Sequence, residues 1–232
     1  MPSTLQRKFW SRTLNILPHA IIGILFGVLI VTSVSSYAEE ADAARPLLTS
    51  DQFHSILHQD AKLLDEAGTI ESFLDALDGT PPNWKEIYGS DGAGHDERLF
   101  ALNRERDRLR EGHDGLTNRL MFLWAGELST YDAERSGFHV AIGPKLIPTR
   151  WGLVRFKPEN LPSNFVAVPP RTLNESLQKR VRNGERIEID VALTGRLLPD
   201  ESIIYDFAHD ESGQGMVMPV VRVERVGYIL KQ

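Results

Sequence analysis

The sequence predicts an α+β fold in which a small helical region precedes a longer β-rich region. Within residues 49–112 the apolar side chains recur at spacings of three and four, which is the period of an amphipathic helix. After residue 115, short apolar runs rich in β-branched and aromatic residues are separated by turn-forming residues, which is typical of strands. Hydrophobic residues make up 41% of the chain and charged residues 25%, and both values are ordinary for a globular protein.

The first 38 residues have the three parts of a secretory signal peptide. A basic segment without acidic residues is followed by a predominantly apolar run over residues 20–34, and then by small residues. Ser36 and Ala38 fit the small-residue positions of a cleavage site, so we expect cleavage after Ala38. The next residues, 39–48, are expected to form a flexible lead-in.

An uncleaved anchor is the alternative interpretation of the same segment. A membrane-spanning helix needs about 20 apolar residues, and the run over residues 20–34 is shorter and contains glycine, threonine and serine. In both cases the basic end stays in the cytoplasm and the remainder is translocated. Because the chain has no cysteine, disulfides and a lipidated cysteine are excluded. We therefore expect the bacterial periplasm, with an inner-membrane anchor as the alternative.

Three helices are expected in the helical region, residues 49–112. Thr49 and Gln52 have the spacing of a capping box and begin a predicted helix over residues 51–67. The other two helices are predicted over residues 70–78 and 96–111, and the segment between them, rich in proline and glycine, is predicted to be a loop.

The β-rich region covers residues 116–232 and contains one helix. Strands are predicted over residues 120–131, 138–142, 151–156, 165–168, 187–194 and 220–230. The helix is predicted over residues 172–183, where Thr172 and Glu175 have capping-box spacing. A long loop is predicted over residues 199–215, and the alternation of the last strand slips near Arg225, which indicates a bulge.

This order of elements resembles the OB-fold, a five-stranded Greek-key barrel with a helix between strands three and four. Gly126 and Gly195 lie inside the first and fourth strands, where a small closed barrel needs sharp bends. The resemblance is one of topology over residues 116–232 and includes no family motif. It implies ligand binding on the strand two and three face and at the rim. Another small α+β fold with an antiparallel sheet is the alternative.

Two groups of residues are candidates for ligand binding in such a barrel. A basic run with an aromatic residue contains Arg150, Trp151, Arg155 and Lys157, and such a face suits a strand of nucleic acid, a glycan or an anionic partner. The alternative is that Trp151 belongs to the core and the cations are solvated.

The second group lies in the segment between the last two predicted strands. It contains Tyr205, Asp206, His209 and Asp210. A histidine among carboxylates can act as an acid or base, and oxygen-rich loops can hold Ca²⁺. The alternative is a solvated hairpin tip.

Evidence for catalysis or a metal site is weak. His54 and His58 have the i, i+4 spacing of two zinc ligands, but the glutamate that follows the first histidine in that zinc motif is absent. We expect no metal site there and no cofactor. The chain also lacks a Gly-x-Ser-x-Gly elbow and a P-loop lysine.

These observations favour an exported, soluble, non-enzymatic binding module that acts in the bacterial cell envelope on a protein or envelope component. Removing the first 38 residues leaves 23 basic against 32 acidic residues, which disfavours nucleic acid as a partner. Two alternatives remain open. One is an envelope hydrolase or metal-dependent enzyme that uses the Asp/His-rich loop over residues 200–211. The other is a membrane-tethered assembly factor whose N-terminal helix stays uncleaved.

Overall fold

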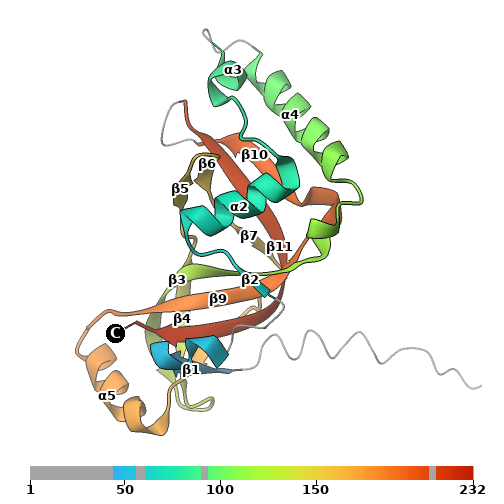
Figure 1. Ribbon diagram of the computed structural model, residues 1–232. Coiled ribbons are helices and arrows are strands. Elements are labelled where there is room, and N and C mark those ends of the chain that lie inside the picture. Colours follow the sequence, from blue (N-terminus) through green and yellow to red (C-terminus); the bar gives the residue numbers. More distant parts are fainter. Residues whose placement is uncertain (1–43, 56–60, 90–93, 209–212, 232) are drawn as a thin grey trace, which may run out of the picture. The chain divides into compact units, whose positions relative to one another are not determined.

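The computed structural model describes residues 44–55, 61–89, 94–208 and 213–231 (Figure 1). All of them belong to one compact unit, and its α+β class is as predicted. The described strands form one sheet of eleven strands, more than the five of the predicted barrel. The predicted signal peptide lies outside the described residues. Within the described ranges, no helix is both long and apolar enough to cross a membrane.

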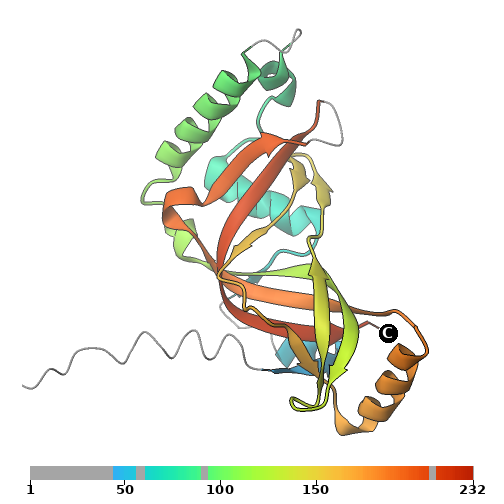
Figure 2. The ribbon, with the colours of Figure 1, turned by 180° about the vertical axis from the view of Figure 1, so that it is seen from behind.

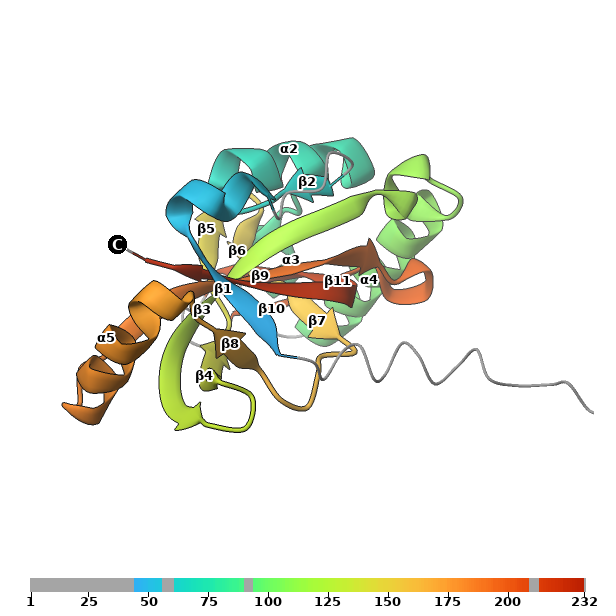
Figure 3. The same ribbon diagram turned by 90° about the horizontal axis from the view of Figure 1, so that it is seen from below.

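Six strands pair in a closed ring. In ring order they are β1 (Arg45–Thr49), β8 (Val166–Val168), β4 (Gly137–Gly143), β3 (Arg119–Asp132), β9 (Ile187–Leu197) and β11 (Gly215–Leu230), and β11 pairs back to β1 (Figure 3). The strands of this ring other than β1 lie where the sequence predicts strands. Alternate residues of β3, such as Phe122 and Leu128, point into the main core, while Met121 belongs to a small second core on the other face. Burial on both faces explains the continuous apolar run at the start of this strand.

β1 occupies residues that were expected to be a lead-in, and this expectation is wrong for the described part. Leu47 is buried in the ring, and β1 pairs in parallel with β8 through Arg45 and Pro46 and with β11 from Leu47 onward. The sequence of β1 is too short to show the alternation of apolar and polar residues that indicates a strand. Its hydrogen bonds come from strands more than 100 positions later in the chain, so only the tertiary structure defines it.

The predicted helix over residues 51–67 is also wrong. The chain forms a 3₁₀ helix, η1 (Ser50–Ser55), and a strand, β2 (Ala61–Leu63), which pairs in parallel with β3. Phe53 and Leu63 pack with Met121 and Ile229 in a small second core. Gln52 does accept a hydrogen bond from the Thr49 N–H at 3.1 Å, which is one half of a capping box. Packing against the ring therefore overrides the helical spacing.

A second group of strands continues from the ring through the long strand β11. Residues 215–219 of β11 pair with β10 (Ile203–Phe207), and residues 216–217 also pair with β6 (Gly152–Val154), whereas residues 220–230 belong to the ring (Figure 2). β5 (Ile147–Thr149) pairs with β6, and β7 (Lys157–Glu159) pairs with β11. The predicted loop over residues 199–215 therefore contains β10 and the short helix η3 (Pro199–Glu201). Antiparallel pairing with β11 makes the short run Ile203–Phe207 a strand and not a loop.

Helices α2 (Ala67–Asp78), α3 (Trp84–Tyr88) and α4 (His95–Arg110) pack against this second group of strands. α2 contacts β5, and α4 contacts β10. The predicted helices over residues 70–78 and 96–111 are confirmed, with Ile70, Phe73 and Leu74 buried as their spacing indicates. One continuous core joins these helices, the second group of strands and the ring interior. The short helix η2 (Asp114–Thr117) leads from α4 into β3.

Helix α5 (Arg171–Arg182) follows β8 and confirms the helix predicted over residues 172–183. The predicted capping box is absent. The helix begins after Pro170, and no side chain from the described residues caps it. The N–H groups of Leu173 and Asn174 instead donate to the Pro170 carbonyl. Proline close to a helix start is favourable because its φ is already helical.

Gly195 marks a close approach of two ring strands. A Cβ atom at this position would lie 2.0 Å from the carbonyl oxygen of Arg222 on β11. Directly after this contact the register of β11 shifts between Val223 and Arg225, so the predicted bulge is confirmed. Gly126 on β3 likewise leaves room for the side chains of Val191 and Ile189. Both glycines therefore allow the strands to approach closely.

Candidate functional site

Arg150 and Trp151 lie at the turn between β5 and β6, and their side chains bind acidic residues of α2. Trp151 is fully buried, and its Nε1 donates to Asp75 Oδ1 at 3.1 Å. Its carbonyl oxygen accepts from Trp84 Nε1 at 2.7 Å. The Arg150 guanidinium is exposed but pairs with both Asp75 and Glu71 of α2. A buried ring cannot stack on a ligand. Trp151 is therefore a core residue, which was the alternative interpretation of the basic run.

The other two cations of the basic run lie elsewhere. Arg155 is exposed, and its backbone N–H donates to the Val217 carbonyl at 3.0 Å. Lys157 Nζ lies 3.5 Å from a carboxylate oxygen of Glu159 and 4.0 Å from one of Glu201. All four candidates belong to the segment between β4 and β8, which forms part of the second group of strands. They do not lie on ring strands β4 and β8, so the run is not a face of the ring.

The candidates between the last two predicted strands are only partly described. Asp206 is half-buried and accepts a hydrogen bond from the Phe207 N–H at 2.8 Å. His209 and Asp210 lie outside the described residues, as does His58. His54 lies in η1, and its side chain is outside the description. Among the residues that the structure describes, no group of three or more metal-binding side chains could hold an ion.

Tyr205, the remaining candidate, belongs to a buried polar cluster that sequence reasoning missed. Its hydroxyl donates to the carboxylate of Asp78 at the end of α2. The Asp78 carboxylate also faces Arg110 of α4, whose Nε lies 2.8 Å from Oδ1. This N–H is not aligned with the oxygen, so the contact is an ion pair without a hydrogen bond. Arg110 Nη1 donates to Ser202 Oγ at 2.7 Å and to the Ile203 carbonyl at 3.2 Å.

The cluster is sealed from solvent. The side chains of Asp78 and Arg110 are 0% and 1% exposed, and Tyr205 and Ser202 are buried as well. Burial raises the pKa of Tyr205 far above its usual value, and the negative charge of Asp78 raises it further. The tyrosine therefore remains a neutral donor. With no access for a substrate, these groups hold α2, α4 and β10 together and do not form a reaction centre.

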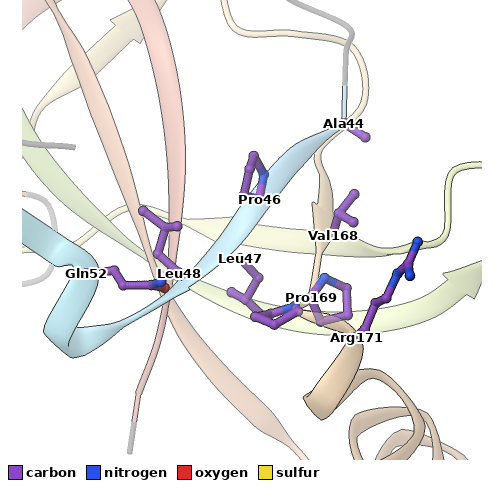
Figure 4. A pocket seen from close by; sticks show the side chains of 9 residues that line it. Ala44, Pro46, Leu47, Leu48, Gln52, Val168, Pro169 and Arg171 are labelled. Carbon is purple, nitrogen blue, oxygen red and sulfur yellow. The ribbon is translucent and has the colours of Figure 1, made fainter. Parts of the chain in front are cut away.

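A groove lies beside β1. Its volume is about 520 Å³, and its lining is mostly apolar or proline (Figure 4). The lining residues are Ala44, Pro46, Leu47, Leu48, Gln52, Val168, Pro169, Pro170 and Arg171. We call this site the β1–β8 groove.

The ring pairing explains where the β1–β8 groove lies. β1 pairs with β8 only at Arg45 and Pro46, and from Leu47 onward it pairs with β11. The two strands therefore diverge after Pro46, and the start of α5 borders the resulting gap. Gln52 and Arg171 are the polar side chains of the lining. Such a site can bind an apolar segment that carries a carboxylate, but it contains no pair of groups suited to acid–base chemistry.

The sequence contained only an indirect signal for the groove. Pro169 and Pro170 interrupt β8 before α5 and keep the chain from continuing the strand.

Comparisons with known protein families, with curated proteins and with solved structures found no match.

Proposed function

We propose that this chain is an exported, non-enzymatic binding module of the bacterial cell envelope and that its ring is an OB-like barrel. In this assignment β3, β4, β8, β9 and β11 are the five barrel strands, and α5 is the helix between the third and fourth. β1 is an additional strand between β8 and β11. The pairing order of the ring supports the assignment, because OB strands three and five are neighbours and β1 runs parallel to both here.

The observation that carries the binding role is the β1–β8 groove. It lies on the third barrel strand, and strands two and three form the usual OB binding face. The apolar lining suits burial of one or two apolar side chains, and Arg171 at the edge suits a carboxylate. We propose a protein segment of the envelope as the partner, bound in an extended form along β1.

Export is supported by the signal-peptide pattern of the first 38 residues. An enzymatic role is less well supported. Among the described candidates, Tyr205 is buried and Arg150 is engaged in ion pairs. The membrane-tethered alternative differs only in whether the segment over residues 20–34 is retained.

Site-specific photocrosslinking in the native host tests the binding role. A benzophenone amino acid at the exposed Pro46 position should give a discrete covalent adduct with an envelope protein. The same amino acid at Glu134, an exposed residue of the β3–β4 turn, is the matched control and should give none. Val168→Arg, which fills the groove with a charged side chain, should abolish the Pro46 adduct. If Pro46 gives no adduct in a folded chain, or if Val168→Arg leaves the adduct unchanged, the groove is not the binding site.

A further inference from the structure

The second group of strands has one face that the helices do not cover. Tyr205 of β10 and Val217 of β11 pair with each other, and the contacts of Tyr205 with Asp78 and Arg110 show that this side faces α2 and α4. The residues between them point to the opposite side of the sheet, because side chains alternate along a strand. We call this side the outer face, and its residues are Pro148, Leu153, Arg155, Ile204, Asp206, Met216 and Met218.

The outer face is largely apolar and belongs to neither hydrophobic core of the described structure. Leu153, Ile204, Met216 and Met218 are half-buried in the single chain, and none of them packs into either core. Figure 2 shows this side with no described helix over it, whereas α2 and α4 lie on the other side (Figure 1). Strands that are apolar on both faces are normally covered on both, so the outer face has the character of an interface.

The outer side of the ring is different. Its apolar residues, such as Met121, are covered by Phe53 and Leu63 in the second core. Where this side is open, β9 carries the exposed charged residues Glu188 and Arg196. An uncovered apolar surface is therefore a specific property of the second group of strands within the described structure.

Strand register arranges the outer face in two rows. In the first row Asp206 lies beside Met216, and Met216 lies beside Leu153. In the second row Ile204 lies beside Met218. The two methionines therefore lie at the centre, and the carboxylate of Asp206 lies at one corner.

Arg155 extends the second row on the other side of β11. Val154 and Phe156 are buried and Arg155 between them is exposed, so its side chain points outward. The pairing of β11 with β6 and then with β7 keeps one register, which places Arg155 beside Met218. The apolar centre is thus bordered by an acid, Asp206, and by a base, Arg155, at opposite corners.

We propose that the outer face packs against the outer face of a second copy of this chain. A two-fold axis between the faces, at right angles to the line from Asp206 to Arg155, places each Asp206 opposite the Arg155 of the other copy. The same operation places the apolar centres on each other, and methionine side chains adapt well to such a contact. The charges therefore make the face complementary to itself.

This interface goes beyond the proposed function and does not depend on it. None of the residues of the outer face lines the β1–β8 groove. A dimer formed in this way leaves the groove of each copy open to its own partner.

Sedimentation equilibrium of the full chain over a range of concentrations tests the proposal. D206R or R155D alone replaces both ion pairs of the dimer by like-charge contacts, because the two-fold axis repeats every contact. Each should raise the dimer dissociation constant by on the order of 100-fold. The double variant D206R/R155D restores opposite charges, and its dissociation constant should return to within about tenfold of the wild-type value.

Two matched variants control for net charge. E188R and R108D change the charge by the same amounts at exposed positions of β9 and α4, and both should dimerise as the wild type does. Every variant carries the same N-terminal segment, so differences between variants do not come from residues 1–38. Equal melting temperatures show that the variants are folded.

Methyl NMR of methionine locates the contact. The chain has four methionines, of which Met216 and Met218 lie on the outer face and Met121 lies in the second core. Raising the protein concentration should shift the methyl signals of Met216 and Met218 and leave that of Met121 unchanged.

The proposal is overturned if the wild type stays monomeric throughout, or if D206R or R155D dimerises as the wild type does. It is also overturned if the folded double variant does not recover, or if E188R and R108D weaken the dimer equally. D206R should retain the photocrosslink at Pro46, so loss of the dimer with a retained crosslink separates the two surfaces. A wild-type monomer that gives the Pro46 crosslink removes only the dimer.

Discussion

At the residue scale, the buried Asp78–Arg110 pair is the contact whose loss should affect stability most. Arg110→Met would leave the Asp78 carboxylate buried and without its cation. We expect this variant to lose about 3–5 kcal/mol of unfolding free energy, measured by urea denaturation at neutral pH. The double variant Asp78→Leu with Arg110→Met should recover most of the loss, since both charges are gone. Wild-type stability in the single variant would contradict this role for the pair.

The buried tyrosines should make the fold sensitive to alkaline pH. Burial raises the pKa of Tyr205 and also that of Tyr228 in the folded state. Their stabilising effect is complete below the unfolded pKa of about 10, and it is lost as the pH rises above that value, because only the unfolded chain ionises there. Each tyrosine contributes a slope of up to about 1.4 kcal/mol per pH unit.

Tyr205→Phe tests this assignment. At neutral pH the variant should lose about 1–3 kcal/mol, because the Asp78 carboxylate loses its hydroxyl donor. Above about pH 10 its stability should fall less steeply than that of the wild type. Urea denaturation at several alkaline pH values measures both effects. An unchanged alkaline slope would show that Tyr205 ionises normally in the folded chain.

The functional roles of single residues were the hardest to predict from the sequence. Trp151 lies among cations in the sequence, but its polar partner Asp75 lies on α2, 76 positions earlier. Tyr205 lies among acidic residues, yet its partner Asp78 comes from the same distant helix. Local composition therefore suggested exposed faces, whereas long-range contacts bury these side chains.

At the scale of elements, Gly195 offers the sharpest test of the close strand approach. Gly195→Ala would place a methyl group against the Arg222 carbonyl, so we expect a loss of about 1–3 kcal/mol and a lower melting temperature. Gly68→Ala in α2 is the matched control, since nothing lies within 4 Å of a Cβ there. It should be neutral or stabilising by up to about 1 kcal/mol. Thermal unfolding followed by circular dichroism compares them, and equal effects would contradict the close approach.

Long elements were predictable, whereas most short ones were not. α2, α4, α5, β3, β9 and β11 have between 11 and 16 residues, so each contains several apolar residues that indicate it in the sequence. β1, β2 and β10 have five residues or fewer. Their pairing partners define them, and the residues around Phe53 carry a helical spacing that packing against the ring overrides.

At the scale of the whole molecule, β11 connects the two groups of strands. Its first residues pair with β10 and β6, and the remainder closes the ring. The α+β class and the order of the main elements followed from the sequence. The β1–β8 groove did not, because it forms where a strand from residues 45–49 meets the chain near residue 168.

The central claim is that the folded chain is exported and works in the envelope, and intact-mass analysis after fractionation of the native host tests it most directly. The account predicts a species in the periplasmic fraction whose mass corresponds to a chain beginning at Glu39. A full-length species in the membrane fraction would show that the segment over residues 20–34 is retained as a membrane tether and is not a cleaved signal peptide. A full-length species in the cytoplasmic fraction would contradict export, and with it the proposed role of the groove.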